Sequence, residues 1–286
     1  MTLHQILASA RNRLVAAGLP AADAAVDVDL FARAILGWDK VQILTRTSEA
    51  EPDGLEPRLT EWVTRRANRE PCAYIIGRRE FFGLEFRVTP AVLIPRPETE
   101  MVVEEAVRLA TMLAAPRIAD IGTGSGCIAV AVARELPQSQ LVATDVSSGA
   151  LSVAYDNAVR HRVADRITFV TTSYLGGVEG DFDVIVANPP YVRLRDKPAL
   201  ARDVRHEPDV ALFGGETGLR DIEGVLDTAS AKLRPGGWLV MEFGFGQEDE
   251  VRTLVGERQR LAIERVRNDL QGIPRTAVIQ VAPHPA

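Results

Sequence analysis

A short apolar run in the second half of the chain ends in residues that could position a planar chemical group. Residues 184–187, Val-Ile-Val-Ala, have the length and β-branched content of a buried strand. Asn188, Pro189, Pro190 and Tyr191 follow. Proline cannot donate to a strand ladder and holds φ at about −65°, so the strand must end there in a stiff backbone. Asn188 is then placed at the carboxyl end of a strand, where open α/β sheets bind their ligands.

The Asn-Pro-Pro-Tyr turn resembles the motif of methyltransferases that act on a nitrogen attached to a planar group, and this resemblance implies how such a nitrogen would be held. The Asn188 side-chain oxygen and a backbone carbonyl of the proline turn would each accept one N–H, which turns the nitrogen lone pair toward an electrophile. Tyr191 could stack on the flat group and accept part of the developing positive charge. The alternative is an ordinary turn that ends a strand, which is common for Asn-Pro alone.

A glycine-rich loop lies upstream of this turn. The stretch "ADIGTGSGCIAVAVA" (119–133) joins a strand to a helix through Gly122, Gly124 and Gly126. Glycines there permit a tight turn and let a ligand approach backbone N–H groups at the start of a helix. The Gly-Lys-Ser/Thr ending of a phosphate-binding P-loop is absent, and the glycine spacing departs from the dinucleotide fingerprint.

Asp145 ends the next strand, in "LVATDVS". A carboxylate at this place accepts hydrogen bonds from both hydroxyls of a ribose. The loop and the acid, in the order strand, loop, helix, strand, therefore predict a cofactor that contains a nucleoside. The loop resembles that of class I methyltransferases, which bind S-adenosylmethionine. The competing interpretation is a structural glycine turn with Asp145 capping the following helix.

The elements that must position these motifs alternate between strands and helices from residue 117 onward. The predicted strands are 117–121, 140–145, 167–171, 182–187, 237–243, 261–267 and 276–282. The predicted helices are 126–135, 148–161, 218–233 and 247–258. This alternation predicts an α/β fold with a mostly parallel, Rossmann-like sheet. The last two strands have no helix between them, so we expect an antiparallel pair at one edge.

The first 70 residues show only helical spacing, beginning with Thr2 and Gln5 as a capping box and including an amphipathic segment at 55–68. A β-hairpin is expected next, with a first strand through Phe82 to Val88 and a second at 92–94. The predicted organisation is a helical domain, a hairpin linker and an α/β domain, with boundaries at residues 1–78, 79–97 and 98–286.

Composition excludes several classes of protein. The hydrophobic content of 46% is that of a globular chain, and the net charge of −6 does not favour a polyanionic partner such as nucleic acid. Two cysteines and four scattered histidines give no metal-ligand spacing, so no metal is expected. No segment reads as a membrane span or a signal sequence. We expect a cytoplasmic protein that works as a monomer.

Longer stretches carry a closer resemblance that covers nearly the whole chain. They are "REPCAYIIGRREFFGLEFRVTPAVLIPRPETE" (69–100), the glycine loop, "ATDVS", "NPPY", "HEPDVALFGGETGLRDIEGVLDTASAKLRPGGWLVMEFG" (206–244) and "NDLQGIPR" (268–275). Together they resemble the peptide-chain-release-factor glutamine methyltransferases. That resemblance implies S-adenosylmethionine as cofactor, release factors as protein substrates and the glutamine of their Gly-Gly-Gln motif as the methylated residue. It also implies that residues 1–78 form a substrate-binding domain and residues 98–286 the methyltransferase domain.

The resemblance also implies roles for individual residues. Asp145 would bind the cofactor's ribose, and Tyr174, in "TTSYLG", lies where the family often has an Asp-Trp pair beside the adenine. Ser173 replaces that acid, so the contact with the adenine amine has no obvious acceptor. Tyr174 could still stack on the base, and a buried aromatic side chain without a ligand is the alternative. Asn188 would contact both cofactor and substrate. The cofactor's methionine part would be lined by Gly122, Thr123, Gly124, Ser125 and Gly126, and the substrate amide by Asn188, Pro189, Pro190 and Tyr191.

Other residues allow two interpretations. Arg96 could reach the substrate or pair with Glu98 or Glu100, and the structural role is slightly favoured. Glu207 could shape the pocket or brace the loop after Tyr191. Cys127 is expected to be a small packed side chain. A basic run is expected to be a solvated face, with contact to an acidic release-factor surface as the alternative; it comprises Arg65, Arg66, Arg69, Arg78 and Arg79.

Two other functions have to be weighed. A nucleic-acid amino-methyltransferase would bring adenine or cytosine into the same pocket, but it should need a basic groove. A non-catalytic adaptor that keeps the fold is disfavoured by the intact glycine loop and Asn-Pro-Pro-Tyr turn.

Overall fold

The structure, a computed structural model, describes residues 1–282, so His284 and the end of the predicted methyltransferase domain lie outside the described residues. The chain divides into two compact units. The helical unit comprises Met1–Gly77 and Ala201–His206, and the sheet unit comprises Arg78–Leu200 and the described residues from Glu207 onward. Each unit is described by itself below.

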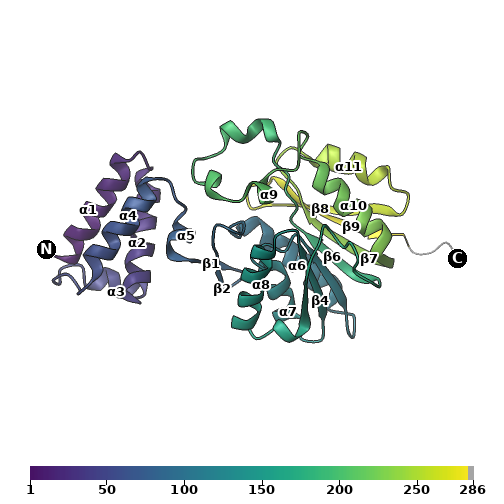
Figure 1. The fold of residues 1–286 in the computed structure, drawn as a ribbon, viewed down its shortest axis with the longest axis horizontal. Helices are drawn as coiled ribbons and strands as arrows, with labels where there is room; N and C mark the ends of the chain where they lie inside the picture. Colours follow the sequence, from purple (N-terminus) through teal and green to yellow (C-terminus); the bar gives the residue numbers. More distant parts are fainter. Residues whose placement is uncertain (283–286) are drawn as a thin grey trace. The chain divides into compact units, whose positions relative to one another are not determined.

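The helical unit forms as its spacing predicts. Thr2 caps the first helix in a complete capping box with Gln5, and Gly37 ends the second in a left-handed conformation, with φ of 68°. Leucine, isoleucine and valine side chains from the inner faces form one core. The helices are α1 Leu3–Ala16, α2 Ala21–Leu36, α3 Lys40–Thr45, α4 Leu55–Ala67 and α5 Cys72–Ile76 (Figure 1).

The predicted solvated basic face is wrong for Arg66. Its side chain is buried, and the guanidinium contacts the carboxylates of Asp27 and Asp203 at 2.6 and 2.7 Å. Arg65 and Arg69 also bond to groups within the helical unit. A buried cation must be paired, which is why α4 directs Arg66 inward toward two acids.

The predicted hairpin is present, but its turn comes earlier than expected. Strands β1 Arg78–Phe81 and β2 Leu84–Arg87 pair antiparallel. Phe82 and Gly83 connect them with φ of 52° and 68°. Two consecutive positive φ values give the tight turn whose twist matches a hairpin. The second strand predicted at 92–94 is therefore wrong, and those residues run as irregular backbone.

The predicted mixed sheet is confirmed. It has seven strands in the order β5-β4-β3-β6-β7-β9-β8. The strands from β5 to β7 are parallel, whereas β9 pairs antiparallel with both β7 and β8. Their bounds are β3 Arg117–Ile121, β4 Gln140–Asp145, β5 Ile167–Thr171, β6 Phe182–Ala187, β7 Leu233–Glu242, β8 Leu261–Asn268 and β9 Pro274–Val281.

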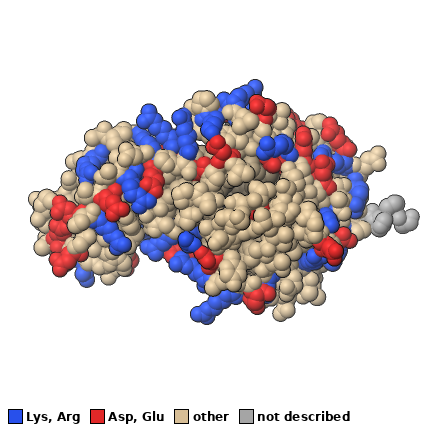
Figure 2. Space-filling model, in the orientation of Figure 1, with Lys and Arg blue, Asp and Glu red and all other residues tan. Residues whose placement is uncertain are grey.

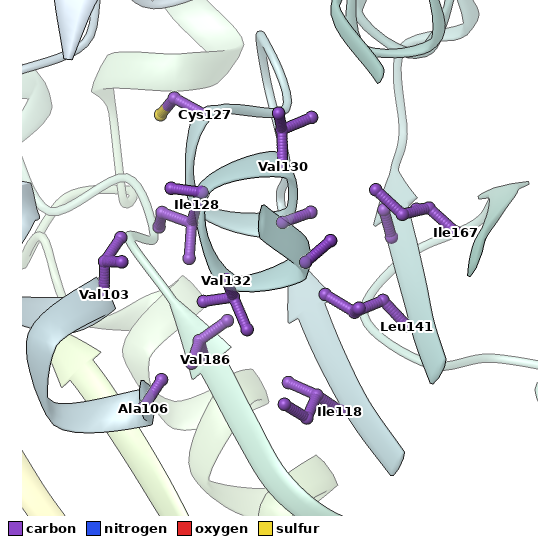
Figure 3. Packing of buried hydrophobic residues seen from close by; sticks show 14 of the residues in the cluster. Val103, Ala106, Ile118, Cys127, Ile128, Val130, Val132, Leu141, Ile167 and Val186 are labelled. Carbon is purple, nitrogen blue, oxygen red and sulfur yellow. The ribbon is translucent and has the colours of Figure 1, made fainter. Parts of the chain in front are cut away.

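Helices cover both faces of this sheet. Valine, isoleucine and alanine side chains of α6, α7 and α8 pack on one face, and α10 and α11 pack on the other. Figure 3 shows the first of these faces, with side chains of α6 and α7 against those of the strands. The helices are α6 Glu100–Ala110, preceded by the 3-10 turn η1 Pro97–Thr99, then α7 Cys127–Glu135, α8 Ser148–Arg160, α9 Asp209–Leu212, α10 Arg220–Lys232 and α11 Glu248–Gly256. Further 3-10 turns of the sheet unit are η2 Ala164–Arg166 and η3 Leu194–Ala199, whereas η4 Val204–His206 belongs to the helical unit.

Within residues 1–282, none of the helices combines the length and apolar character that a bilayer span requires.

Candidate functional site

A cavity opens at the carboxyl ends of the parallel strands. Strand β3 lies inside the sheet, with β4 on one side and β6 on the other, and this reversal of strand order is where α/β sheets bind ligands. The cavity has a volume of about 390 Å³, and its walls come from the loops after β3, β4, β5 and β6, from residues before α6 and from α9 and α10. The sheet thus brings together motifs that lie far apart in the sequence.

The glycine loop forms one wall. Gly122 and Gly124 have φ of 71° and 54°, and a Cβ built on either would meet no atom within 4 Å, so the space beside them is open. Thr123 and Ser125 also line the cavity. Gly126 is not one of the lining residues. Its φ is 79°, and an added Cβ would come within 3.0 Å of the Ala154 Cβ, so this glycine permits close packing of α7 and α8.

Asp120, at the end of β3, was missed by the sequence analysis. Its Oδ2 accepts hydrogen bonds from the Thr123 hydroxyl at 2.6 Å and from the backbone N–H of Ala129 at 3.2 Å. The other oxygen has no partner among the described residues. Complete burial raises the pKa of Asp120 to about 7. An acid directly before a glycine loop was the available signal, and it holds the loop to the start of α7.

Asp145, at the end of β4, lies beside the glycine loop and lines the cavity. Its carboxylate accepts from the backbone N–H of Gly124 at 3.0 Å and of Ser147 at 2.9 Å. Burial raises the pKa of Asp145, whereas these backbone donors lower it. Each oxygen has a lone pair left, which suits the two hydroxyls of a ribose. The open space over the glycines and this acceptor pair fit S-adenosylmethionine, with Asp145 suited to its ribose.

Tyr174 also lines the cavity. Its hydroxyl donates to Asp221 at 3.2 Å, and its ring lies so close to α10 that a Cβ on Gly224 would come within 2.1 Å of the ring. Ser173 lines the cavity in place of the missing acid. Asp221, also in the wall, is a carboxylate that the sequence analysis did not single out.

Asn188 lies in the cavity wall with Pro189 and Pro190. The Asn188 side-chain nitrogen donates to the hydroxyl of Thr99 at 2.9 Å. Within the described part of the chain, neither the Asn188 Oδ1 nor the Pro189 carbonyl accepts a hydrogen bond. Two residues of the cavity wall therefore each keep an acceptor oxygen without a partner among the described residues.

A buried carboxylate is joined to Asn188 through Thr99. Glu242, at the end of β7, is 1% exposed. It accepts from the Thr99 hydroxyl at 2.6 Å and from the Tyr191 hydroxyl at 3.1 Å. Burial raises the pKa of Glu242, and the two hydroxyl donors lower it. Burial and the Glu242 charge also raise the pKa of Tyr191. Tyr191 is not one of the lining residues, so its stacking on a substrate stays a prediction.

Arg96 pairs with neither of the partners that the sequence analysis considered. It contacts the carboxylate of Glu207, which also accepts from the backbone N–H of Ile94 at 3.0 Å. The pairing with Glu98 or Glu100 is therefore wrong, and Glu100 instead accepts from a backbone N–H of the hairpin turn. Glu207 holds the segment before α6 that forms part of the cavity wall.

Cys127 is a packed side chain, as predicted. Burial raises the pKa of its thiol to about 12, which removes the reactivity that a helix N-terminus could otherwise confer. Among residues 1–282, no group of three or more His, Cys, Asp or Glu side chains is arranged to hold a metal ion.

Comparison with known proteins identifies the family. Residues 5–77 match the PrmC N-terminal domain, and residues 102–210 match the methyltransferase small domain. A release factor glutamine methyltransferase of Bradyrhizobium diazoefficiens is 40% identical over 98% of this chain and 96% of its own. The chain belongs to the release factor glutamine methyltransferase family. A family member from Koribacter versatilis is 37% identical over 97% of this chain and 98% of its own, and one from Geobacter sulfurreducens is 42% identical over 87% of each.

Solved structures of other methyltransferases share the fold of this release factor glutamine methyltransferase family member. The hMettl16 catalytic domain in complex with a MAT2A 3′UTR hairpin aligns with a TM-score of 0.56 at 17% identity, covering 90% of this chain and 94% of its own. The Thermus thermophilus 16S rRNA methyltransferase RsmC aligns with a TM-score of 0.51 at 18% identity, covering 72% of this chain and 50% of its own. Identities this low indicate the fold alone. Because the family is S-adenosylmethionine-dependent, the cavity residues are the candidate cofactor site.

Proposed function

We propose that this protein transfers the methyl group of S-adenosylmethionine to the side-chain amide nitrogen of the glutamine in the Gly-Gly-Gln motif of peptide-chain release factors. The observation that carries the proposal is the pair of available acceptors in the cavity wall, the Asn188 Oδ1 and the Pro189 carbonyl. A primary amide presents two N–H groups, which matches two acceptors on a rigid turn. Full-length similarity to release factor glutamine methyltransferases supports the choice of substrate.

The chemistry follows from the weak nucleophilicity of an amide nitrogen, whose lone pair is delocalised into the carbonyl. Accepting both N–H groups favours a more tetrahedral nitrogen and turns its lone pair toward the sulfonium methyl carbon that the cofactor supplies. The nitrogen–methyl bond forms as the sulfur–methyl bond breaks, and S-adenosylhomocysteine is the coproduct. The nitrogen becomes strongly acidic on methylation and releases one proton, so the site needs no strong base.

We assign the cofactor to the walls that carry the glycine loop and Asp145. Residues 122–125 would contact its methionine part, and Asp145 would accept from the ribose hydroxyls. Tyr174 lies in the wall where the adenine would be held, and Asp221 beside it offers a carboxylate in place of the acid missing at Ser173.

We assign the helical unit to binding of the release factor. Its match to the PrmC N-terminal domain over residues 5–77 supports this role. The nucleic-acid alternative receives no support from charge. On the face shown in Figure 2, basic and acidic side chains are interspersed around the sheet unit, and its central part is mostly uncharged. A groove for a polyanion would instead gather basic side chains.

The test is methylation of a purified release factor. Wild-type protein and S-adenosylmethionine are incubated in separate reactions with an unaltered release factor, with a release-factor variant whose Gly-Gly-Gln glutamine is replaced by alanine, and with DNA or RNA. Mass spectrometry should find one added methyl group, on that glutamine alone. The Asn188→Ala variant should be slower by about 100-fold or more, with little change in cofactor affinity. Methylation of nucleic acid but not of the release factor would overturn the proposal.

A further inference from the structure

Thr99, Glu242 and Asn188 are joined by hydrogen bonds, and of these three residues only Asn188 has a role in the proposed reaction. The register Ala187 to Met241 places the ends of β6 and β7 side by side, so Glu242 lies next to Asn188. Thr99 bridges them, with hydrogen bonds of 2.6 Å to the Glu242 carboxylate and 2.9 Å from the Asn188 side-chain nitrogen. Three separate segments of the chain therefore meet at one amide.

Thr99 lies at the start of α6 but does not cap that helix with its side chain. It occupies the N-cap position of α6, where a threonine hydroxyl ordinarily accepts from a backbone N–H of the first turn. Here the Thr99 side chain makes no capping bond. Its hydroxyl is committed to Glu242 and Asn188 instead, and Thr99 also lines the cavity.

The direction of each hydrogen bond follows from the donors present. Two hydroxyls, of Thr99 and Tyr191, converge on Glu242, one on each carboxylate oxygen. An ionised carboxylate accepts from both without conflict. The single Thr99 proton is then directed at Glu242, so the Thr99 oxygen offers only lone pairs to Asn188. Asn188 must turn its NH₂ group toward Thr99 and its Oδ1 away from Thr99.

The geometry points to Thr99 and Glu242 as positioning residues that set which end of the Asn188 amide faces the substrate. This inference rests on the proposed role of Asn188. The two ends of an asparagine amide have nearly the same shape, so packing alone cannot distinguish them. A flipped Asn188 would direct its NH₂ at the NH₂ of the substrate glutamine, and one of the two acceptors would be lost. The chain of hydrogen bonds removes that alternative.

A hydroxyl-deletion series tests the inference. Thr99→Val keeps the shape of the side chain but removes the donor to Glu242 and the acceptor for Asn188. We expect kcat to fall by about 10-fold to 100-fold, while the Kd for S-adenosylmethionine, measured by calorimetry, changes by less than about 2-fold. Thr99→Ser restores the hydroxyl, and its kcat should recover to within about 3-fold of wild type. If Thr99→Val fails to fold, Thr99→Ala provides the same deletion without a branched side chain.

Thr276→Val is the matched control. Thr276 is buried on β9 and pairs with Glu242 across the antiparallel ladder, and its hydroxyl has no partner among the described residues. Thr276 therefore lies next to Glu242 without taking part in the hydrogen bonds that join Glu242, Thr99 and Asn188. We expect its kcat to match wild type. A loss equal to that of Thr99→Val would mean that any change near Glu242 slows the reaction, and would overturn the inference.

Asn188→Ala in the same assay separates the inference from the function on which it depends. An inactive Asn188→Ala beside a Thr99→Val of wild-type kcat would overturn the positioning role alone. A Thr99→Ser variant as slow as Thr99→Val would also overturn it, because the hydroxyl would then not be the group that matters. Full activity of Asn188→Ala would overturn the proposed role of Asn188 and this inference together.

Discussion

The guanidinium of Arg96 and the carboxylate of Glu207 form an ion pair across 111 residues of sequence. The Glu207 side chain is 2% exposed and also accepts from the backbone N–H of Ile94. Glu207→Ala would leave a cation and a buried N–H without an acceptor. We expect a loss of about 2–4 kcal/mol in the free energy of unfolding and a higher KM for the release factor, because this segment lines the cavity. Urea denaturation and steady-state kinetics measure the two effects.

The exposed pair between Lys197 and Asp209 is the control for that prediction. Their side chains are 49% and 64% exposed, and such pairs contribute about 0–1 kcal/mol. Asp209→Asn should therefore leave the denaturation midpoint nearly unchanged. Equal losses in Glu207→Ala and Asp209→Asn would contradict the bracing role of Glu207.

Asp145→Asn should weaken cofactor binding. The substitution removes the charge that faces the predicted ribose hydroxyls and exchanges one acceptor oxygen for a donor, which conflicts with the N–H of Gly124 or Ser147. Hydrogen bonds to a charged group are worth about 1.5–3 kcal/mol, so the Kd for S-adenosylmethionine should rise by about 10-fold to 100-fold in titration calorimetry. Asp156→Asn is the control, since Asp156 is an exposed acid on α8 that pairs with Arg87. Unchanged affinity in Asp145→Asn would rule out the assigned ribose contact.

Asp120 should make the protein less stable as the pH rises from about 4 to about 7. Burial raises its pKa from 3.8 to about 7, so in that range the folded protein keeps a proton that the unfolded chain has released. The folded state then binds more protons, and stability falls with rising pH until both states are ionised. A shift of this size corresponds to at most about 4 kcal/mol.

Asp120→Asn removes this titration. Urea denaturation at several pH values between about 5 and about 8 should show a smaller decline in unfolding free energy for the variant than for wild type. The unfolding free energy of the variant should still decline somewhat with pH, because burial also raises the pKa values of Glu242 and Asp145. The same slope in both proteins would show that Asp120 is ionised throughout the range.

Gly214 should be intolerant of any side chain. A Cβ there would lie 2.4 Å from the carbonyl oxygen of Pro190 and 2.8 Å from that of Gly218, both backbone atoms. Gly214→Ala must therefore displace the turn that carries Asn188, and we expect kcat to fall by about 10-fold or more. Gly256→Ala is the control, because a Cβ at the end of α11 meets no atom within 4 Å. It should be neutral or stabilise the protein by up to about 1 kcal/mol. Wild-type kcat in Gly214→Ala would contradict the close packing.

Local sequence determined the elements and the two motifs of the site. Alternating strand and helix periodicity, the glycines after β3 and the prolines after β6 act over a few neighbouring residues. Their structural consequences can therefore be predicted from the sequence alone. Every predicted strand of the large sheet is present, with small differences at the ends. The hairpin turn was misplaced because Phe82, a residue that rarely adopts positive φ, does so at 52°.

Only the tertiary structure decided which polar groups meet. Thr99 and Glu242 are 143 residues apart, and Asn188 and Thr99 are 89 apart. No spacing rule links residues at such separations; the parallel strand register and the packing of α6 against the sheet bring them together. Burial then determined their chemistry, because a carboxylate removed from water must find donors. That requirement selects the two hydroxyls of Thr99 and Tyr191, and through Thr99 it orients Asn188.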